Sequence, residues 1–314
     1  MRIILNKNPG KSAASWLAVL FLSGCSAFAP SPPAATTTLP IPAEMSPAVV
    51  EPVRRLPRLG LALGGGAARG FAHVGVIQVL EQHGIRPHLV VGTSAGSLVA
   101  ALYASGMGAA ELERTAMAME EATLTDWTMP LLGRGMLRGE ALARYVRTEV
   151  KGRLIENMPI PLGILATDLA SGEGVVFRRG DAAQAVRASS AVPGLFIPVA
   201  IAGHDYVDGG LVAPVPVAQA RAMGAEVVLA VDISSDPAGN SAQGWVQVLL
   251  QTTAIMGQSI NRLAMSGADV VPVRPALSGV GSADFSARQR SIEAGRAAML
   301  AALPRLKAEM ARLR

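Results

Sequence analysis

The chain has 314 residues, of which 50% are hydrophobic and 16% charged, so it is long enough to bury one large core or two modest ones. Its formal charge is +5, but without three basic residues near the N-terminus 25 basic and 23 acidic residues remain. A balance so close to neutral, with no basic run, excludes nucleic acid as an expected partner. Four histidines and one cysteine leave no cluster typical of a metal site, and we expect no metal or other cofactor.

The first 24 residues have the pattern of a secretory signal peptide. Basic residues precede an apolar run over 13–22 that is too short to span a bilayer. The run ends at Leu22-Ser23-Gly24-Cys25, which resembles the lipobox of bacterial lipoproteins and implies that Cys25 is lipidated and becomes the mature N-terminus. The alternative is cleavage after Ala29, which would leave Pro30 directly behind the cut, an arrangement that signal peptidases disfavour.

Residues 25–57 are predicted to link the lipidated cysteine to a folded domain. Eight prolines fall among Ala, Thr and Ser over 26–57, a composition typical of a tether with polyproline II character. At about 3.1 Å per residue, such a tether could hold the domain up to ~100 Å from a membrane. Because Ser26 rather than Asp follows Cys25, we expect an outer-membrane lipoprotein of the bacterial cell envelope that faces the periplasm.

The folded domain is predicted to extend over 58–314 without a second boundary. A buried strand over 59–63 leads through a glycine-rich loop to a helix over 71–83, and a strand over 88–91 leads to a helix over 96–104. Further helices are expected over 109–121, 139–150, 182–188, 214–223, 242–265 and 286–312, the last interrupted near Pro304. Further strands are expected over 161–167, 174–178, 226–231 and 270–273, with a hairpin around Gly203-His204. Strands that alternate with helices through short turns predict an α/β fold with a mostly parallel sheet.

One serine stands at the apex of the second strand–helix turn. Gly92-Thr93-Ser94-Ala95-Gly96 matches the G-x-S-x-G pattern of a nucleophile elbow, in which the glycines permit a strained and closely packed turn. The helix that follows would direct free N–H groups and its positive dipole end toward the serine. In a chain with 33 glycines the same pattern also fits an ordinary strand–helix turn, so the role of Ser94 depends on other parts of the sequence.

The loop Gly64-Gly65-Gly66 is the candidate oxyanion hole. Three consecutive glycines after a strand leave backbone N–H groups unpaired, and parallel strand order would bring this loop beside the elbow. Gly64, Gly66 and Gly70 also fit a nucleotide-binding turn. That type of site needs an acidic residue at the end of the next strand, where this chain has the elbow instead.

Two arrangements remain for the base that would activate Ser94. His204 is the only histidine after Ser94, and a triad of Ser94, Asp168 and His204 would require a residue at a predicted hairpin tip to enter the site. The alternative is Asp208 at the end of an apolar strand, where Gly209-Gly210 lets the chain turn and present the carboxylate. A carboxylate acting directly on a hydroxyl needs a pKa raised by burial and an oxyanion hole for the developing charge.

Four blocks in this order resemble the patatin-like phospholipase family, especially its bacterial members near the neuropathy-target-esterase branch. The blocks are Gly64-Gly65-Gly66-Ala67-Ala68-Arg69-Gly70, Gly92-Thr93-Ser94-Ala95-Gly96, Ala191-Val192-Pro193-Gly194 and Asp208-Gly209-Gly210. The resemblance covers about residues 58–300 and implies a three-layer α/β/α sandwich with a mostly parallel central sheet. It further implies a Ser94–Asp208 dyad, an oxyanion loop at Gly64, Gly65 and Gly66, and supporting roles for Arg69, Gly92, Gly96, Gly209 and Gly210.

The resemblance also implies hydrolysis of acyl esters, commonly of phospholipids or lysophospholipids. Together with the lipobox, it predicts an acyl-ester hydrolase with a lipid substrate, anchored to the membrane through Cys25. The alternative is a catalytically idle lipoprotein scaffold that binds lipid or an envelope partner. One group of residues either lines an acyl-chain channel or packs in the core: Met117, Met119, Trp127, Met129, Leu131, Leu132, Met136 and Leu137. Trp245 and Leu249 on the long helix are expected in the core.

Overall fold

The computed structural model describes residues 55–121, 126, 134–238 and 243–313. The predicted signal peptide, Cys25 and nearly all of the tether lie outside the described residues, as do Trp127, Met129, Leu131 and Leu132. The chain from Val53 to Arg314 forms one compact unit. Within its described part, every helix is too short or too polar to cross a bilayer.

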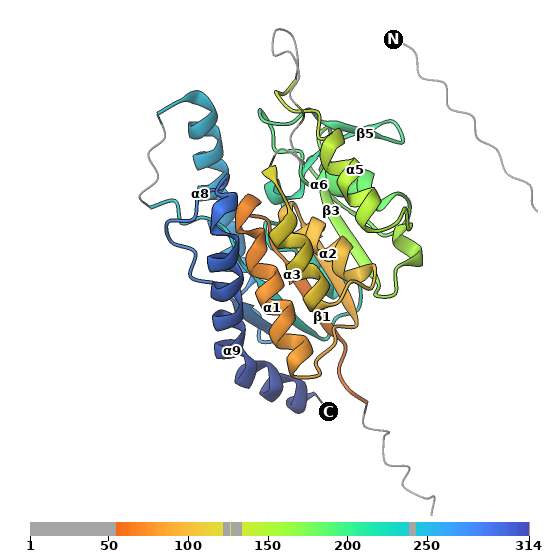
Figure 1. Cartoon of the computed structure of the whole chain (residues 1–314), viewed down its shortest axis with the longest axis vertical. Helices are drawn as coiled ribbons and strands as arrows, with labels where there is room; N and C mark the ends of the chain where they lie inside the picture. The colour runs from red at the N-terminus through yellow and green to blue at the C-terminus, as the bar shows by residue number, and fades with distance from the viewer. Residues whose placement is uncertain (1–54, 122–125, 127–133, 239–242, 314) are drawn as a thin grey trace, which may run out of the picture. The chain divides into compact units, whose positions relative to one another are not determined.

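A mixed sheet of eight strands forms the centre of this unit (Figure 1). Five parallel strands lie in the order β3-β2-β1-β7-β8, with the bounds Leu162–Asp168, Leu89–Thr93, Leu59–Leu63, Val227–Val231 and Val270–Val273. Three further strands pair in antiparallel fashion beyond them. β4 (Gly174–Phe177) and β6 (His204–Asp208) pair with β3, and β5 (Val199–Ile201) pairs with β6. The predicted α/β fold with a mostly parallel sheet is confirmed.

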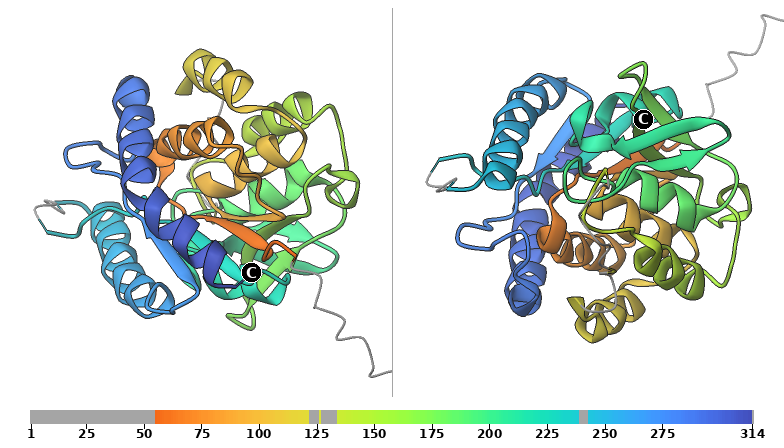
Figure 2. Two further views of the ribbon diagram at one scale, coloured as in Figure 1. Left: turned by 90° about the horizontal axis from the view of Figure 1, so that it is seen from below. Right: turned by 90° about the horizontal axis from the view of Figure 1, so that it is seen from above.

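Helices cover both faces of the sheet, because alternate side chains of a buried strand point to opposite faces. Leu61 and Leu63 of β1 belong to one core cluster, whereas Ala62 belongs to a second one on the other face. The first face is covered by α1, α2, α3, α5, α6 and α9, with the bounds Phe71–Gln82, Ala95–Ala104, Ala109–Ala118, Glu140–Glu149, Ala182–Ser189 and Arg288–Arg312. The second face is covered by α7 (Val217–Ala222) and α8 (Trp245–Ala264). Figure 2 shows the resulting three layers from two sides, as predicted.

The parallel register aligns the carboxyl ends of four strands. Leu63 of β1 pairs with Gly92 on one side and Val231 on the other, and Val231 pairs with Val273. The residues that follow these strands therefore meet at one edge of the sheet, where ligands of open α/β sheets bind. These residues are Gly64 after β1, Ser94 after β2, Asp232 after β7 and Arg274 after β8.

The C-terminal helix differs from the prediction. α9 continues through Pro304 to Arg312, although a proline cannot donate the usual helical hydrogen bond. Figure 1 shows that α9 bends toward its C-terminal end instead of stopping. Leu303 and Leu306, on either side of the proline, are buried, so packing of this helix on its neighbours offsets the lost bond.

The prediction that Trp245 and Leu249 of α8 belong to the core is wrong. Their exposed fractions are 70% and 37%. The helix instead contacts the rest of the protein through small and polar residues: Gly257 lies against Pro214, and the buried Asn261 accepts a hydrogen bond from the Val215 N–H at 3.1 Å. This inner face leaves the large apolar side chains of α8 directed outward.

Candidate active site

Ser94 occupies a strained turn between β2 and α2. Its backbone angles are φ 52° and ψ −126°, a conformation that costs a non-glycine residue on the order of 1–3 kcal/mol and that persists only where the surroundings enforce it. A Cβ on Gly96 would lie 2.1 Å from the Leu63 carbonyl oxygen, and one on Gly92 would lie 2.4 Å from the Gly96 carbonyl oxygen. The glycines of the elbow are therefore required by close backbone contact.

Hydrogen bonds from two other segments hold this turn in place. Thr93, just before the serine, donates its hydroxyl to the Ala213 carbonyl at 3.0 Å. The Ser94 N–H donates to the hydroxyl oxygen of Ser189 at 2.9 Å, and Ser189 donates in turn to the Leu165 carbonyl at 2.5 Å. The backbone at the serine is thus fixed relative to both β3 and α6.

Asp208, at the end of β6, meets Ser94 across the sheet edge. Its main-chain N–H donates to the Ala191 carbonyl at 2.9 Å, and it pairs with Ala166 of β3. Its buried carboxylate accepts a hydrogen bond from the Gly210 N–H at 2.6 Å and another from the Ser94 hydroxyl. Burial raises the pKa of Asp208 to about 6, and the two hydrogen bonds oppose this rise because they favour the ionised form.

His204 lies away from the serine. It begins β6 whereas Asp208 ends it, and four residues of strand span about 13 Å. Its side chain is 60% exposed, and its Nδ1 lies 2.7 Å from Oδ2 of Asp168. Asp168 and His204 therefore pair with each other, away from Ser94. Among the described residues, no three His, Cys, Asp or Glu side chains gather as metal ligands would.

The glycine-rich loop lies against the elbow, but only part of it has free donors. A Cβ on Gly65 would lie 3.0 Å from the Ser94 Cβ. The N–H groups of Gly64 and Gly65 are already engaged, since they donate to the carbonyls of Val231 and Pro214, both at 3.0 Å. The N–H of Gly66 has no acceptor in the described part of the chain.

Two further main-chain N–H groups beside the serine also lack an acceptor among the described residues. Ala67 and Ala95 have no main-chain acceptor among the described residues, and both line the cavity into which Ser94 faces. Ala67 has φ 52°, so the loop, like the elbow, holds a strained non-glycine residue next to the serine. The available donors are therefore those of Gly66, Ala67 and Ala95, of which only Gly66 belongs to the predicted loop of Gly64, Gly65 and Gly66.

His73 is a site residue that the sequence did not point out. It is fully buried on α1, and its Nε2–H donates to the Gly64 carbonyl at 2.8 Å. Burial lowers its pKa to about 4, so the ring is neutral and serves as a fixed donor to the glycine loop. A lone histidine three residues after Gly70, in an otherwise apolar helix start, was the available signal.

The Arg69 side chain takes no part in this hydrogen-bond network. Its main-chain N–H donates to the Gly66 carbonyl at 3.2 Å and so closes the turn Ala67–Gly70. Its side chain, however, makes no hydrogen bond or ion pair with the glycine loop and lines a second cavity, separate from the one at Ser94. The expected help of Arg69 in organising the loop is thus limited to its backbone.

The cavity at Ser94 is apolar and has a volume of about 340 Å³. It is bounded chiefly by α1, α2 and α3, with side chains that include Val74, Leu98, Leu102 and Leu112. Of the residues predicted either to line an acyl channel or to pack in the core, Met119 and Leu137 line this cavity. Met117 is 44% exposed and lies outside it, and Met136 is not among its lining residues.

A family model described as patatin-like phospholipase matches residues 61–221, which is half of the chain and includes both Ser94 and Asp208. An uncharacterized NTE family protein of Mycobacterium tuberculosis is 35% identical over 208 residues, covering 64% of this chain and 58% of that protein. Patatin-like phospholipase domain-containing protein 6 of Homo sapiens is 33% identical over 201 residues, covering 60% of this chain and 14% of that protein.

The crystal structure of VipD from Legionella pneumophila has a similar fold. It superposes with a TM-score of 0.50 at 14% identity, covering 80% of this chain and 67% of that chain. The chain spans less than two thirds of the length of the mycobacterial relative, and the match lies in the segment that builds the elbow, the glycine loop and Asp208. By this match to its central half, the chain belongs to the patatin-like phospholipase family.

Proposed function

We propose that this chain is a serine acyl-ester hydrolase that acts on lipids through a Ser94–Asp208 dyad. One observation carries the proposal: the hydroxyl of a serine in a strained elbow is hydrogen-bonded to a buried aspartate whose pKa is raised to about 6. Such a carboxylate is a stronger base than an exposed one and is still ionised at neutral pH. The apolar cavity beside Ser94 supplies a place for an acyl chain.

In the acylation step, the Ser94 oxygen attacks the carbonyl carbon of the ester while its proton moves to the Asp208 carboxylate. The oxyanion of the tetrahedral intermediate accepts hydrogen bonds from free N–H groups at Gly66, Ala67 and Ala95. When the intermediate collapses, the bond to the leaving oxygen breaks, and Asp208 returns the proton to the departing alcohol. The acyl group remains as an ester on Ser94.

In the deacylation step, water takes the place of the alcohol. Asp208 accepts a proton from this water, whose oxygen attacks the carbonyl of the acyl-enzyme. The second tetrahedral intermediate uses the same N–H donors, and its collapse releases the fatty acid and returns the proton to Ser94. The same carboxylate thus serves as base and acid in both halves of the reaction.

A fluorophosphonate probe tests the nucleophile directly, because it labels serines that are activated by a neighbouring base. We expect the purified domain to be labelled at Ser94 and the Ser94→Ala variant to remain unlabelled. Lipid extracts incubated with wild type, but not with Ser94→Ala, should gain free fatty acid. Absence of both labelling and fatty-acid release from a folded protein would instead support a non-catalytic, lipid-binding scaffold.

We further propose that lipidation of Cys25 anchors this hydrolase in the bacterial envelope, at the outer membrane and facing the periplasm. The support is the sequence Leu22-Ser23-Gly24-Cys25 behind an apolar run. Several acyl chains on one cysteine give stable anchoring, since each buried methylene contributes about 0.8 kcal/mol. Cys25→Ser should move the protein from the membrane to the soluble fraction; a protein that stays in the membrane contradicts the anchor.

A further inference from the structure

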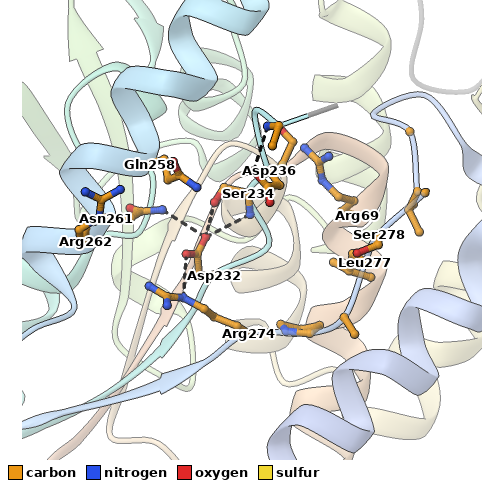
Figure 3. Close-up of a pocket in the computed structure, with 17 residues that line it drawn as sticks. Arg69, Asp232, Ser234, Asp236, Gln258, Asn261, Arg262, Arg274, Leu277 and Ser278 are labelled. Carbon is orange, nitrogen blue, oxygen red and sulfur yellow. Dashed lines mark hydrogen bonds and ion pairs between the residues drawn. The ribbon is translucent and has the colours of Figure 1, made fainter. Parts of the chain in front are cut away.

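A second cavity, which we call the polar cavity, lies at the same sheet edge as Ser94 but shares no lining residue with the serine cavity. It has a volume of about 800 Å³ and is bounded by the segments that follow β7 and β8 and by one face of α8. In Figure 3, Arg69 lies on one side of this space and the α8 residues Gln258, Asn261 and Arg262 lie on the other. The carboxyl edge of a parallel sheet is where α/β folds place their ligands.

Arg69 is the most unusual side chain of this cavity. It is only 9% exposed, its Nε has no hydrogen-bond partner, and no carboxylate lies within ion-pair distance among the described residues. Burial lowers its pKa, and the charge of Asp232 at longer range opposes that effect, but a guanidinium stays protonated in proteins. A buried charge without a direct partner is costly, and a bound anion would offset that cost.

The acidic groups of the cavity do not supply this partner. Asp232 is nearly buried and already saturated: its Oδ1 accepts from the Ser234 N–H at 3.1 Å, the Ser234 hydroxyl at 2.6 Å and the Asn261 amide at 3.2 Å. Its Oδ2 lies 3.4 Å from Nε of Arg274. Asp236 is exposed and accepts from the Ala238 N–H at 3.0 Å.

The remaining groups around the space are donors. Arg262 is exposed and has no hydrogen-bond or ion-pair partner in the described part of the chain. Arg274 is 61% exposed and uses only part of its guanidinium on Asp232. Ser235 and Ser278 add hydroxyls. Several arginine forks with hydroxyls around them form the usual surroundings of a phosphate group.

We infer that the polar cavity binds the phosphate group of a phosphorylated molecule, with Arg69 as its principal contact and Arg262 and Arg274 as further donors. The volume exceeds that of an inorganic ion and falls within the range of organic ligands, so the phosphate is part of a larger molecule. The same chemistry is found in a soluble phosphate ester and in a lipid head group. The inference concerns binding alone and does not require that Ser94 be catalytic.

Thermal unfolding of the chain over 53–314, which forms one compact unit, tests this inference with inorganic phosphate as the first probe. A ligand that binds only the folded state stabilises it by RT ln(1 + L/Kd), where L is the free ligand concentration, so Tm keeps rising with the logarithm of ligand concentration above Kd. We expect Tm of the wild type to rise with phosphate, and Arg262→Gln and Arg69→Lys to weaken binding at least tenfold. Arg144→Gln, an exposed arginine on α5, is the matched control and should leave the response unchanged.

Two further probes separate the sources of the phosphate. Glycerol 3-phosphate that binds more tightly than inorganic phosphate indicates a soluble ester. Pelleting of the chain with phosphatidylglycerol vesicles, lost in Arg262→Gln, indicates a lipid head group. If Arg69→Lys is too unstable to measure, Arg262→Gln and Arg274→Gln suffice, since both side chains are at the surface. A wild type that responds to none of these probes, or responds no more than Arg262→Gln, overturns the inference.

Discussion

The two cavities at the carboxyl edge of the sheet lie on either side of one short turn, yet their surroundings are opposite in character. Ala67, Ala68 and Gly70 of this turn line the apolar cavity of Ser94, while Arg69 between them lines the polar cavity. The turn is a 3₁₀-helix, with about three residues per turn, so neighbouring side chains point in different directions. A single helical turn therefore separates an apolar site from a cationic one.

This separation explains how Asp208 can keep a raised pKa although an arginine lies only three residues after the glycine loop. The pKa of Asp208 is set by burial and by hydrogen bonds from Ser94 and Gly210, with no contribution from Arg69. A guanidinium inside the serine cavity would favour the ionised carboxylate and lower its pKa, which would make it a weaker base. Keeping Arg69 on the far side of the turn preserves the basicity of Asp208.

The largest effect on the serine cavity should come from Asp208→Asn. The amide fills the same space but cannot accept the proton of Ser94, so we expect kcat/KM for a p-nitrophenyl ester to fall by about 10³-fold or more. His204→Ala is the matched comparison, because it removes the only other candidate base. Since His204 is exposed and paired with Asp168, its removal should change kcat/KM less than twofold. Loss of activity in His204→Ala, with activity retained in Asp208→Asn, would instead support the triad of Ser94, Asp168 and His204.

A smaller loss is expected from Gly66→Ala, which acts on the oxyanion donors instead of the base. A Cβ at Gly66 would lie 2.7 Å from the Ile233 carbonyl oxygen, so the loop must move and shift its free N–H groups. Loss of one such donor costs about 10²–10³-fold in kcat. We expect a drop of roughly 100-fold in kcat with little change in KM. Gly244→Ala, where no atom lies within 4 Å of the added Cβ, should retain full activity.

Much of the site could be predicted from the sequence because its parts are local. The elbow around Ser94 and the turn after Asp208 each need glycines at fixed spacing, and buried strands with short turns fix the parallel order that brings them together. The scarcity of histidines left only two candidates for the base, and the family resemblance implied Asp208. Such patterns can be recognised in a sequence because the chemistry of each depends on a few adjacent residues.

Other features depend on contacts between distant segments and could not be read from the chain. The N–H groups of Gly64 and Gly65 are engaged because the carbonyls of Val231 and Pro214, some 150 residues away, lie opposite them. The role of His73 depends on the same fold, since only there does its ring meet the Gly64 carbonyl. Trp245 is a large apolar residue of the kind usually found in a core. It is exposed because α8 packs on the protein through its opposite face.

The dimensions of the serine cavity give a prediction about acyl-chain length. Along α2, Leu102 lies eight residues beyond Ser94, which corresponds to about 12 Å of helix, and both Leu102 and Leu112 of α3 are buried and line the cavity. A cavity of about 340 Å³ holds one acyl chain of medium length. Ala116→Leu on α3 should narrow it, and we expect the ratio of kcat/KM for decanoyl to butyryl esters to fall between ten- and a hundredfold.

Ala110→Leu provides the control for this change, because Ala110 lies on the same helix but is exposed. It should leave the chain-length ratio as in the wild type. An unchanged ratio in Ala116→Leu, with normal Tm, would mean that the acyl chain lies elsewhere. A shift of the preference toward shorter acyl chains in Ala116→Leu would identify this cavity as the acyl-chain site, whatever the head group of the substrate.

The smallest expected effect, and the one that reports on the electrostatics of the serine cavity, is the pH dependence. With a pKa of about 6 at Asp208, kcat/KM should rise about tenfold between pH 5 and pH 7 as the carboxylate ionises. Phosphate binding in the polar cavity, which rests on arginines, should lack an inflection caused by Asp208. A profile without an inflection near pH 6 would contradict Asp208 as the base.

The ionisation of Asp208 also makes the free energy of unfolding depend on pH. Between pH 3.8 and about 6 the native state holds a proton on Asp208 that the unfolded state has lost, so the free energy of unfolding falls as pH rises through this window. His73 acts in the opposite direction: its pKa is lowered from 6.5 to about 4, so stability falls as pH decreases through that range.

In the wild type the pH dependences of stability caused by Asp208 and His73 largely cancel. Asp208→Asn removes only the first, so its stability relative to wild type should increase by about 2 kcal/mol between pH 4 and pH 7, measured by urea unfolding. An inactive variant that is more stable at neutral pH would show that the buried charge is maintained for catalysis and not for folding.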